Sequence, residues 1–468
     1  MPIINYQYGK IIKNCIKNAF SKNIELTNMK NYLDFFNYLD GFLLEIVKKS
    51  MIDSFELIDY EFKHTRRRKQ LYYTKGSYSR TIMTLFGEIT FNREYYVPKD
   101  GSSCGFYYVD KLFNLPKRDY YDPMIKALII EKSAKFSYIQ SGKIVGDMIG
   151  NKFKSMTESL YSRISRQTVY NVIKHADMEY LFDDVKDDVE TLYIQLDEKW
   201  VYTQGNNHKM KEIKAAVVYT NIKEEYNGRN KLVNRYVITS DKSANDIRQK
   251  LLDYIVHTYN VDSIKNIIIS GDGANWIKMT SIDFAIQKGI KSVFVLDRFH
   301  MYQAINHISK DEDIKYYLRE YLKLPRTKSF KELCNVLIIE NPHREDIITK
   351  NRDYILSNWK YIKHQSNPLF KGCSMEGHIS HVLAALFTSR PKAHSLHMIT
   401  KRLRIRELLT NKQDLKSIYL SNHVNPTPDV DYVELNHTYP KELFDVIGHK
   451  VTQKYKYFKR AAHSTIFS

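Results

Sequence analysis

Two aspartates stand in stretches of sequence where a charged side chain is costly. Asp197 lies in LYIQLDEKWVYTQ, an apolar, β-branched and aromatic run in which a buried carboxylate must be paired or bind a cation. Asp272 ends the apolar stretch IKNIIISGDG, where Gly271 and Gly273 would let another backbone or a substrate phosphate approach closely. Taken singly, Asp197 could form a buried salt bridge, and Asp272 could end a strand in a simple turn.

A third carboxylate, Glu376, lies near the start of SMEGHISHVLAALFTSR, whose apolar residues recur at helical spacing. Ser374 is a suitable N-cap for this helix, and an acid in the first turn suits the helix dipole, which is the simpler interpretation of Glu376. If the helix packs on a sheet, Glu376 shares the sheet-facing stripe. That stripe consists of Ile379, Val382, Leu383 and Leu386.

Carboxylates gathered in this way have a defined chemistry. Three of them around one point bind hard divalent cations, and two Mg²⁺ ions about 3.5 to 4 Å apart can act on both ends of a phosphodiester displacement. We therefore predict that Asp197, Asp272 and Glu376 form a catalytic, metal-binding triad for Mg²⁺, with Mn²⁺ as a substitute. Asp297 and His300 form an Asp-x-x-His pair that we expect to support this site, although such pairs are often a helix cap and a surface imidazole.

The elements that must position these acids can be predicted because the spacing of apolar residues changes after Glu190 from a helical period to a period of two. The expected order is strand 192–204, strand 212–222, strand 229–240, a helix at 241–259 capped near Ser243, strand 264–273, a helix at 274–286 and strand 292–297. This β-β-β-α-β-α-β order predicts an α/β, ribonuclease-H-like fold with a mixed sheet. The first and fourth strands should be parallel neighbours, so Asp197 and Asp272 should face each other at the carboxyl ends of these strands.

The remaining segments suggest an interrupted core with a DNA-binding region before it. We expect a basic N-terminal region with helices and a small β element at 1–120, a helix-turn-helix-like region at 121–185, the first part of the core at 186–300, an α-helical insertion at 301–370, the last part of the core with the Glu376 helix at 371–410, and a basic C-terminal tail at 411–468.

The charge of the chain points to a polyanionic partner. The sequence has 72 Lys and Arg against 53 Asp and Glu, a net charge of +19, which favours nucleic acid first and an anionic membrane surface second. The alternative is compositional drift, but drift does not by itself create positive clusters. We expect DNA to be the partner.

Two segments are candidates for DNA contact. The cluster HTRRRKQ is the densest positive run, and SRQTVYNVIKHAD predicts a recognition helix with Ser165 as N-cap and an apolar stripe of Val169, Val172 and Ile173. The predicted DNA-binding residues are Arg66, Arg67, Arg68, Lys69, Arg166, Gln167, Tyr170, Asn171, Lys174 and Arg390.

The cysteine spacing and the length of the apolar runs indicate the kind of compartment to expect. Four widely separated cysteines without a Cys-x-x-Cys pair favour neither a disulfide framework nor a zinc ribbon. No apolar run approaches the ~18 residues that a membrane span requires. We therefore expect a cytoplasmic, nucleoid-associated protein without a membrane partner.

Several of these motifs together resemble a known family. LDEKW, IIISGDGANWIK, VLDRFH, GCSMEGHISHVL, TSRP and the N-terminal LFGEITFNREYY are similar to segments of the Lre-type insertion-sequence transposases of bacteria. That family was formerly an uncharacterised protein family, is of the Asp-Asp-Glu type and is similar to Mutator-like transposases. The resemblance extends from about Tyr72 to Arg390.

The resemblance implies a DNA transposase that cleaves and joins strands, with Asp197, Asp272 and Glu376 as the metal-binding triad and Asp297 with His300 in support. It also implies that the N-terminal region binds terminal inverted repeats, that target DNA is a second partner, and that a homo-oligomer forms in the DNA complex.

The sequence departs from the family pattern at Trp200, Gln303 and the pair Ala393-His394. One alternative is therefore a catalytically inactive or divergent protein that binds specific DNA on the same fold. Another is a nuclease that cuts structured nucleic acid without joining strands.

Overall fold

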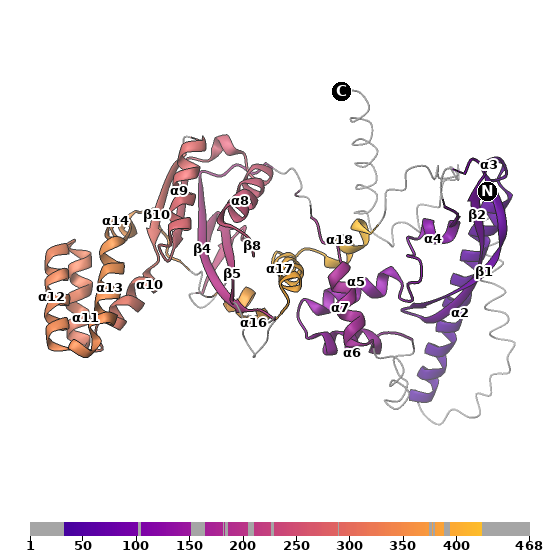
Figure 1. Ribbon diagram of the computed structural model, residues 1–468, viewed down its shortest axis with the longest axis horizontal. Helices are drawn as coiled ribbons and strands as arrows, with labels where there is room; N and C mark the ends of the chain where they lie inside the picture. Colours follow the sequence, from indigo (N-terminus) through magenta and orange to yellow (C-terminus); the bar gives the residue numbers. More distant parts are fainter. Residues whose placement is uncertain are drawn as a thin grey trace. The chain divides into compact units, whose positions relative to one another are not determined.

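The computed structural model describes residues 32–101, 104–150, 164–180, 182, 186–204, 210–225, 229–288, 290–373, 377, 380–387 and 394–423. The fold is a mixture of helices and mixed sheets (Figure 1). The chain divides into two compact units: unit 1 contains residues 1–80, 89–114 and 424–468, and unit 2 contains residues 81–88 and 115–423.

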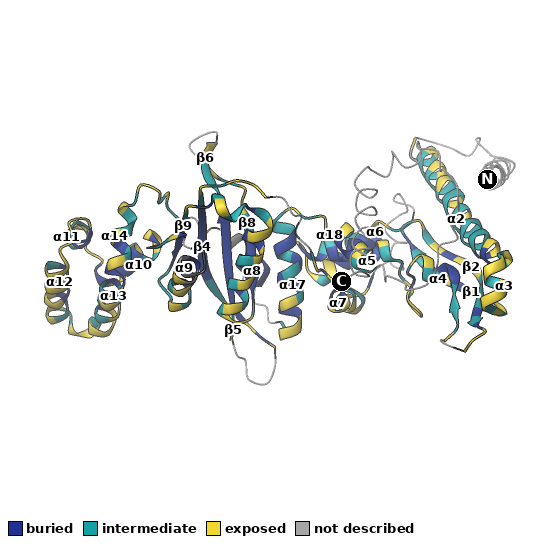
Figure 2. Ribbon diagram, turned by 90° about the horizontal axis from the view of Figure 1, so that it is seen from above, coloured by how far each residue is buried: buried dark blue, intermediate teal, exposed yellow. Residues whose placement is uncertain are grey.

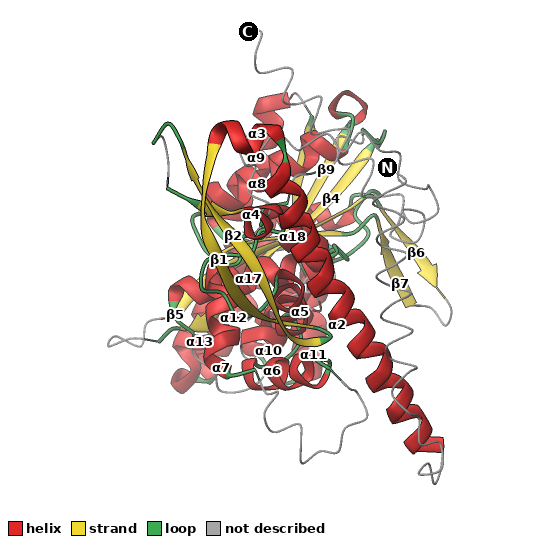
Figure 3. Ribbon diagram, turned by 90° about the vertical axis from the view of Figure 1, so that its right-hand side faces the viewer, coloured by secondary structure: helices red, strands yellow, loops and turns green. Residues whose placement is uncertain are grey.

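Unit 1 is built from a long helix and a small sheet (Figure 3). Its elements are α2 (Tyr32–His64), α3 (Arg66–Leu71), α4 (Tyr108–Leu112) and most of the sheet β1 (Tyr72–Thr84), β2 (Gly87–Pro98) and β3 (Phe106–Tyr107), in the order β1-β2-β3. The hairpin end of this sheet, residues 81–88, is counted with unit 2. The ring of Phe62 on α2 stacks on Tyr108 at 3.8 Å and meets Tyr96 edge-on at 4.9 Å. These contacts hold the carboxyl-terminal part of α2 on the small sheet.

The amino-terminal part of unit 2 is a helical cluster. It consists of α5 (Pro123–Ser133), α6 (Tyr138–Asp147) and α7 (Arg166–His175), together with the later helix α18 (Leu415–Asn422). Ile125, Val169, Ile173 and Ile418 are buried together in its core. Ser165 caps α7 by accepting a hydrogen bond from the backbone N–H of Thr168, as predicted.

A five-stranded sheet forms the centre of unit 2. Its strands are β4 (Thr191–Tyr202), β5 (Met210–Tyr219), β8 (Tyr236–Ser240), β9 (Asn266–Gly271) and β10 (Lys291–Leu296), in the order β10-β9-β4-β5-β8. β4 and β9, the first and fourth predicted strands, are parallel neighbours, and β9 is also parallel to β10. β5 is antiparallel to both β4 and β8.

The predicted strand 229–240 is divided in the structure. Its first half, β7 (Arg229–Val233), pairs with β6 (Asn221–Glu225) in a separate two-stranded sheet, and only its second half, β8, joins the main sheet. Asn234 between them has a φ of 51°, a left-handed conformation that turns the chain. The prediction of one continuous strand was therefore wrong.

Helices cover both faces of the main sheet, and the strands between them are largely buried (Figure 2). The helices α8 (Ala244–Thr258) and α9 (Asn275–Lys288) pack on one face. The π-helical turn η7 (Ser380–Ala384), α16 (Ala385–Phe387) and α17 (Leu396–Thr410) pack on the other. Val382, Leu383 and Leu386 are buried against the sheet, which confirms this part of the predicted stripe.

The predicted insertion is helical throughout. It contains α10 (Arg298–Ile308), α11 (Glu312–Lys323), α12 (Thr327–Glu340), α13 (Glu345–Ser357) and α14 (Trp359–Lys363). Short 3-10 turns lie at η5 (Pro342–Arg344) and η6 (His364–Ser366), and a further one, η4 (Val261–Ser263), precedes β9. The insertion has its own apolar core around Leu318, Phe330 and Ile355.

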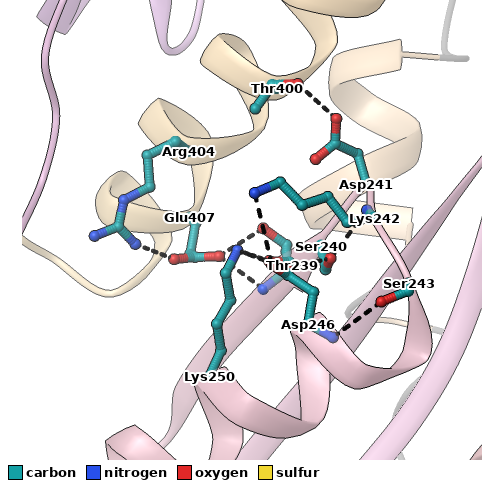
Figure 4. A network of polar contacts seen from close by, with 10 residues as sticks. All are labelled: Thr239, Ser240, Asp241, Lys242, Ser243, Asp246, Lys250, Thr400, Arg404 and Glu407. Carbon is teal, nitrogen blue, oxygen red and sulfur yellow. Dashed lines mark hydrogen bonds and ion pairs between the residues drawn. The ribbon is translucent and has the colours of Figure 1, made fainter.

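A buried carboxylate fixes α17 to the edge strand β8 (Figure 4). Glu407, only 3% exposed, accepts hydrogen bonds from the backbone N–H of Thr239 at 2.7 Å and from its hydroxyl at 2.6 Å. Arg404 pairs with the same carboxylate, so the buried charge is compensated. Two turns earlier, Thr400 donates to Asp241 at 2.5 Å. These bonds hold α17 on the sheet face that carries the candidate site.

Within the described part of the chain, no helix combines the length and apolar character needed to cross a membrane.

Candidate active site

Three aspartates lie at one level of the main sheet. In the register, Gln195 of β4 pairs with Ser270 of β9, and Gly271 of β9 pairs with Leu296 of β10. Asp197 and Asp272 each lie two residues beyond the first pair, and Asp272 and Asp297 each lie one residue beyond the second. Asp272 and Asp297 therefore directly follow the carboxyl ends of β9 and β10, and Asp197 lies at their level within β4, which continues to Tyr202. The neighbouring positions predicted for Asp197 and Asp272 agree with this register, but a place at the carboxyl end of the strand holds for Asp272 alone.

Strand alternation assigns Asp197 to one face of the sheet. Tyr193, Ile268 and Val295 pack in the core beneath η7 and α17. Because side chains alternate between faces along a strand, Asp197, four residues after Tyr193 on β4, shares that face. Asp272 and Asp297 directly follow the last residues of β9 and β10, so their positions are described by their level and their hydrogen bonds rather than by strand alternation.

Local hydrogen bonds hold each carboxylate. Asp197 is 7% exposed, and its Oδ1 accepts a 2.7 Å hydrogen bond from the backbone N–H of Glu198. Oδ1 of Asp272 accepts one from Ala274 at 2.9 Å. Asp297, 4% exposed, caps α10 by accepting from the backbone N–H of Phe299 at 3.0 Å. Asp297 is thus a helix cap, and its place beside the other two aspartates is compatible with a second role.

The glycines around Asp272 allow close packing from two directions. A Cβ at Gly271 would lie 2.6 Å from the carbonyl oxygen of Leu196, so the backbones of β9 and β4 meet there. Gly273 has a φ of 90°, and a Cβ there would lie 2.7 Å from Oδ1 of Asn358. The close approach expected at both glycines therefore involves the protein's own groups.

The helical insertion supplies two residues that sequence reasoning missed. The hydroxyl of Tyr354 on α13 donates a 2.6 Å hydrogen bond to the backbone carbonyl of Asp272. Burial and the negative charges of Asp272 and Asp297 raise the pKa of the Tyr354 phenol, so it remains a donor. Asn358, 2% exposed, packs against Gly273. No local signal in the sequence marks either residue, because both contacts join segments far apart in the chain.

A fourth acid, also missed, lies beside the site on the opposite face of β4. Glu198 accepts a 3.0 Å hydrogen bond from the indole N–H of Trp276. Burial, a hydrogen bond with Glu212 and the negative charges of Glu212 and Asp272 raise the pKa of the Glu198 carboxyl to about 7. Lys214 forms an ion pair with Glu212. The carboxyl groups of Glu198, Glu212 and Asp272 therefore lie near one another at this end of the sheet, and Lys214 compensates part of their charge.

The third predicted carboxylate, Glu376, lies outside the described residues. Cys373 before it and Val382 after it both pack on the face of the sheet that carries Tyr193 and, by alternation along β4, Asp197. Within the described ranges, no three Asp, Glu, His or Cys side chains are grouped so as to hold a metal ion. The donors present at the strand ends are carboxylate oxygens, which suit Mg²⁺ or Mn²⁺ rather than softer metals.

His300 lies three residues after Asp297, in the first turn of α10. Its ring is partly exposed and packs edge-on against Phe299 at 5.3 Å. Arg390, predicted to bind DNA, lies outside the described residues.

The basic cluster of unit 1 forms the short helix α3. Arg66, Arg67 and Lys69 are exposed on it. Arg68 is partly buried, and its Nε donates to the backbone carbonyl of Lys63 at 2.7 Å. Arg68 therefore ties α3 to the end of α2, which leaves the other three as the candidates for phosphate contact.

On α7, four of the five predicted DNA-binding side chains are exposed, namely Arg166, Gln167, Asn171 and Lys174. Tyr170 is instead partly buried against the helical core, where its ring lies 6.3 Å from that of Tyr138. Contact with α6 therefore leaves Tyr170 less accessible than the other four, and DNA binding by these residues stays a prediction.

A short turn precedes α6 in this cluster. A helix-turn-helix has a turn of about 3 to 4 residues. Residues 134–137 connect α5 to α6. Of the residues between α6 and α7, 151–163 lie outside the described part of the chain, so the predicted helix-turn-helix before α7 stays a prediction. A Cβ at Gly142 of α6 would lie 2.3 Å from the carbonyl oxygen of Ile164, so α6 packs tightly against the residue before α7.

Comparison with known proteins gives one family. A family model described as "Uncharacterised protein family (UPF0236)" matches residues 29–421. Three similar relatives are UPF0236 proteins of Caldanaerobacter subterraneus subsp. tengcongensis. The first is 29% identical over 370 residues, which cover 78% of this chain and 75% of the relative. The second is 29% identical with 78% and 74% covered, and its name joins four numbered designations. The third is 28% identical over 373 residues, with 78% and 74% covered, and its name joins eleven designations.

Proposed function

Since the chain belongs to the uncharacterised protein family UPF0236, we propose from its own residues that it is an Asp-Asp-Glu transposase of a bacterial insertion sequence. It binds the ends of its element and catalyses metal-dependent strand cleavage and strand transfer. The observation that carries this proposal is the shared level of Asp197 and Asp272 on two adjacent parallel strands, Asp197 within β4 and Asp272 directly after β9.

The strand order supports the proposal at the level of fold. The order β10-β9-β4-β5-β8, in which β5 alone runs against the others, is the arrangement expected of a ribonuclease-H-like core. The helical insertion between β10 and η7 separates this core from the segment that contains Glu376. A fold of this kind does not by itself imply an activity, so the argument depends on the carboxylates.

The names of the relatives give independent support. One protein of Caldanaerobacter subterraneus subsp. tengcongensis bears eleven designations and another four. Many members of one family within one bacterium are expected of a mobile element and are unusual for a housekeeping enzyme. A transposase that multiplies its own gene accounts for such a pattern.

The proposed chemistry assigns a role to each acid. Asp197, Asp272 and Glu376 would hold Mg²⁺ or Mn²⁺, which when bound lowers the pKa of an attacking water or 3′-hydroxyl and stabilises the leaving oxygen. The backbone N–H groups of Glu198 and Ala274 each occupy one carboxylate oxygen and so fix the rotamers of Asp197 and Asp272. Asp297 adds negative charge beside the two ligands.

DNA binding is assigned to separate surfaces. The exposed residues of α7 would contact the element ends, and those of α3 would contact phosphates, in keeping with the net charge of +19. These surfaces do not contain the catalytic acids. Binding and cleavage should therefore be separable by mutation.

The test uses the purified full chain and a labelled duplex that carries the presumed ends of the element, with Mg²⁺ or Mn²⁺. Asp272→Asn keeps an oxygen that can accept from Ala274 but removes the charge. We expect nicks at the element boundary with the unaltered chain, and at least about 100-fold less cleavage with Asp272→Asn at equal DNA affinity. Asp313→Asn, an exposed acid of α11, is the matched control and should cleave normally.

Two outcomes would redirect the proposal. Specific binding without nicks in any metal would favour the alternative of a DNA-binding protein without catalysis on this fold. Equal cleavage by Asp272→Asn would remove Asp272 from the site.

A further inference from the structure

The two faces of the unit 1 sheet differ at its open end. On one face, Tyr72 and Phe106 pack against Phe62 of α2, with ring centroids 6.4 and 6.5 Å from that of Phe62. Consecutive residues of a strand point to opposite faces, so Tyr73 points away from this core. It is 54% exposed.

Three more tyrosines lie on the face with Tyr73. Tyr95 pairs with Tyr107 across β2 and β3, while their neighbours Tyr96 and Phe106 form the next pair on the α2 side. Tyr78 lies an odd number of residues after Tyr73 on β1, but Gly76 between them has a φ of 131°, which interrupts the regular alternation. The contacts of Tyr78 with both rings of the first pair, at centroid distances of 6.5 Å from Tyr95 and 6.2 Å from Tyr107, place it on their face, and it is 50% exposed. We call these four residues, Tyr73, Tyr78, Tyr95 and Tyr107, the tyrosine face.

The inner rings of the tyrosine face are held firmly. A Cβ at Gly105 would lie 2.5 Å from the ring of Tyr95, so this ring rests directly on backbone. The guanidinium of Arg93 lies 3.7 Å from the centre of the Tyr107 ring, and Arg93 also pairs with Asp110. Rings fixed in this way lose little conformational entropy when a flat partner stacks on the face.

The surroundings of the tyrosine face are basic. Residues 65–80 contain six Lys and Arg and no Asp or Glu. The ammonium groups of Lys75 and Lys99 lie 5.9 and 5.1 Å from the centre of the Tyr73 ring. Lys99 also donates a 2.6 Å hydrogen bond to the backbone carbonyl of Lys69, which joins α3 to this edge of the sheet. The face thus combines exposed rings with cations suited to phosphates.

We propose that the tyrosine face binds single-stranded DNA, with unpaired bases stacked on Tyr73 and Tyr78 and the backbone phosphates held by Lys75, Lys99 and α3. Aromatic rings on a sheet combined with nearby basic side chains recognise single strands, because every base offers a flat face. A duplex keeps its bases stacked on each other and would offer this face only phosphates. The inference goes beyond the proposed transposase activity and needs no metal.

The test measures fluorescence anisotropy of a labelled, mixed-sequence single-stranded DNA with the full chain in EDTA. Stacking is worth about 1 to 3 kcal/mol per base, so Tyr73→Ala with Tyr78→Ala should weaken binding by about 10- to 100-fold. Tyr73→Phe with Tyr78→Phe keeps both rings and should bind within about twofold of the unaltered chain. Tyr60→Ala is the matched control, since Tyr60 is 58% exposed on α2 of the same unit.

Three results would overturn the proposal. They are unchanged binding by the alanine pair, an equal loss in the phenylalanine pair, and stronger competition by an unlabelled duplex or RNA than by single-stranded DNA. Because the assay contains EDTA and no element ends, a failure here leaves strand cleavage untouched. Loss of cleavage in the Asp272→Asn variant, conversely, leaves single-strand binding intact.

Discussion

The hydroxyl of Tyr354 lies 2.6 Å from the backbone carbonyl oxygen of Asp272, and this hydrogen bond joins α13 of the insertion to the turn that follows β9. Asn358, one turn further along the chain, packs against the neighbouring Gly273. The insertion is thus attached directly to the segment that carries one of the candidate ligands. These two contacts help to fix the position of the turn that carries Asp272.

The first prediction concerns the hydrogen bond from Tyr354 to Asp272. Tyr354→Phe removes the hydrogen bond, which is worth about 0.5 to 1.5 kcal/mol, and keeps the ring. If Asp272 is a metal ligand, cleavage should fall about 2- to 10-fold and require more Mg²⁺, while the affinity for duplex DNA stays constant. Tyr316→Phe, on the exposed surface of α11, controls for general loss of a phenol. A cleavage rate and a Mg²⁺ requirement equal to those of the unaltered chain would show that the hydrogen bond is only structural.

The second prediction concerns the meeting of β4 and β9. Gly271→Ala places a methyl group 2.6 Å from the carbonyl oxygen of Leu196 and 2.9 Å from Cδ1 of Ile277. Backbone cannot yield easily there, so the free energy of unfolding should fall by about 1 to 3 kcal/mol. Thermal unfolding followed by circular dichroism measures this effect. The control is Gly377→Ala, where the added methyl group would have no atom of the described residues within 4 Å. Equal melting temperatures for the two variants would contradict the packing described.

The strand order and the placement of Asp197 and Asp272 could be predicted from the sequence because period and burial are local properties. The division of the third strand could not, since it depends on the left-handed backbone at Asn234. Tyr354 and Glu198 were missed for a different reason. Their partners lie far away in the chain, 82 residues for the contact of Tyr354 with Asp272 and 78 for that of Glu198 with Trp276.

A third prediction concerns the pH dependence of unit 1. Asp59 on α2 is 3% exposed and accepts a 2.7 Å hydrogen bond from the backbone N–H of Glu94. Burial, opposed in part by this bond, raises the pKa of the Asp59 carboxyl from 3.8 to about 6. The folded state therefore binds the proton more tightly than the unfolded state. The resulting stability is fully present below about pH 4 and is lost as the pH rises through 6.

Asp59→Asn should remove this dependence. Asparagine stays neutral and retains an oxygen for Glu94, so at pH 7 the variant should be more stable than the unaltered chain by about 1 to 2 kcal/mol. Near pH 4 the two should be similar. Thermal unfolding of both chains at several pH values between 4 and 7 measures the difference. A gap that does not change over this range would refute the protonation argument.

The last prediction tests α7 as the element-binding helix. Arg166 and Lys174 are exposed at its two ends, while Ser165 caps it and Val169 and Ile173 anchor it in the core. Replacing both by alanine should leave folding intact and weaken binding to a duplex carrying the element ends. Each lost phosphate contact should reduce the slope of log affinity against log salt by about 1. The control Lys328→Ala removes a cation whose side chain is 91% exposed on α12. If the control lowers the slope as much as the α7 pair does, the salt dependence comes from overall charge, and α7 has no specific role in DNA contact.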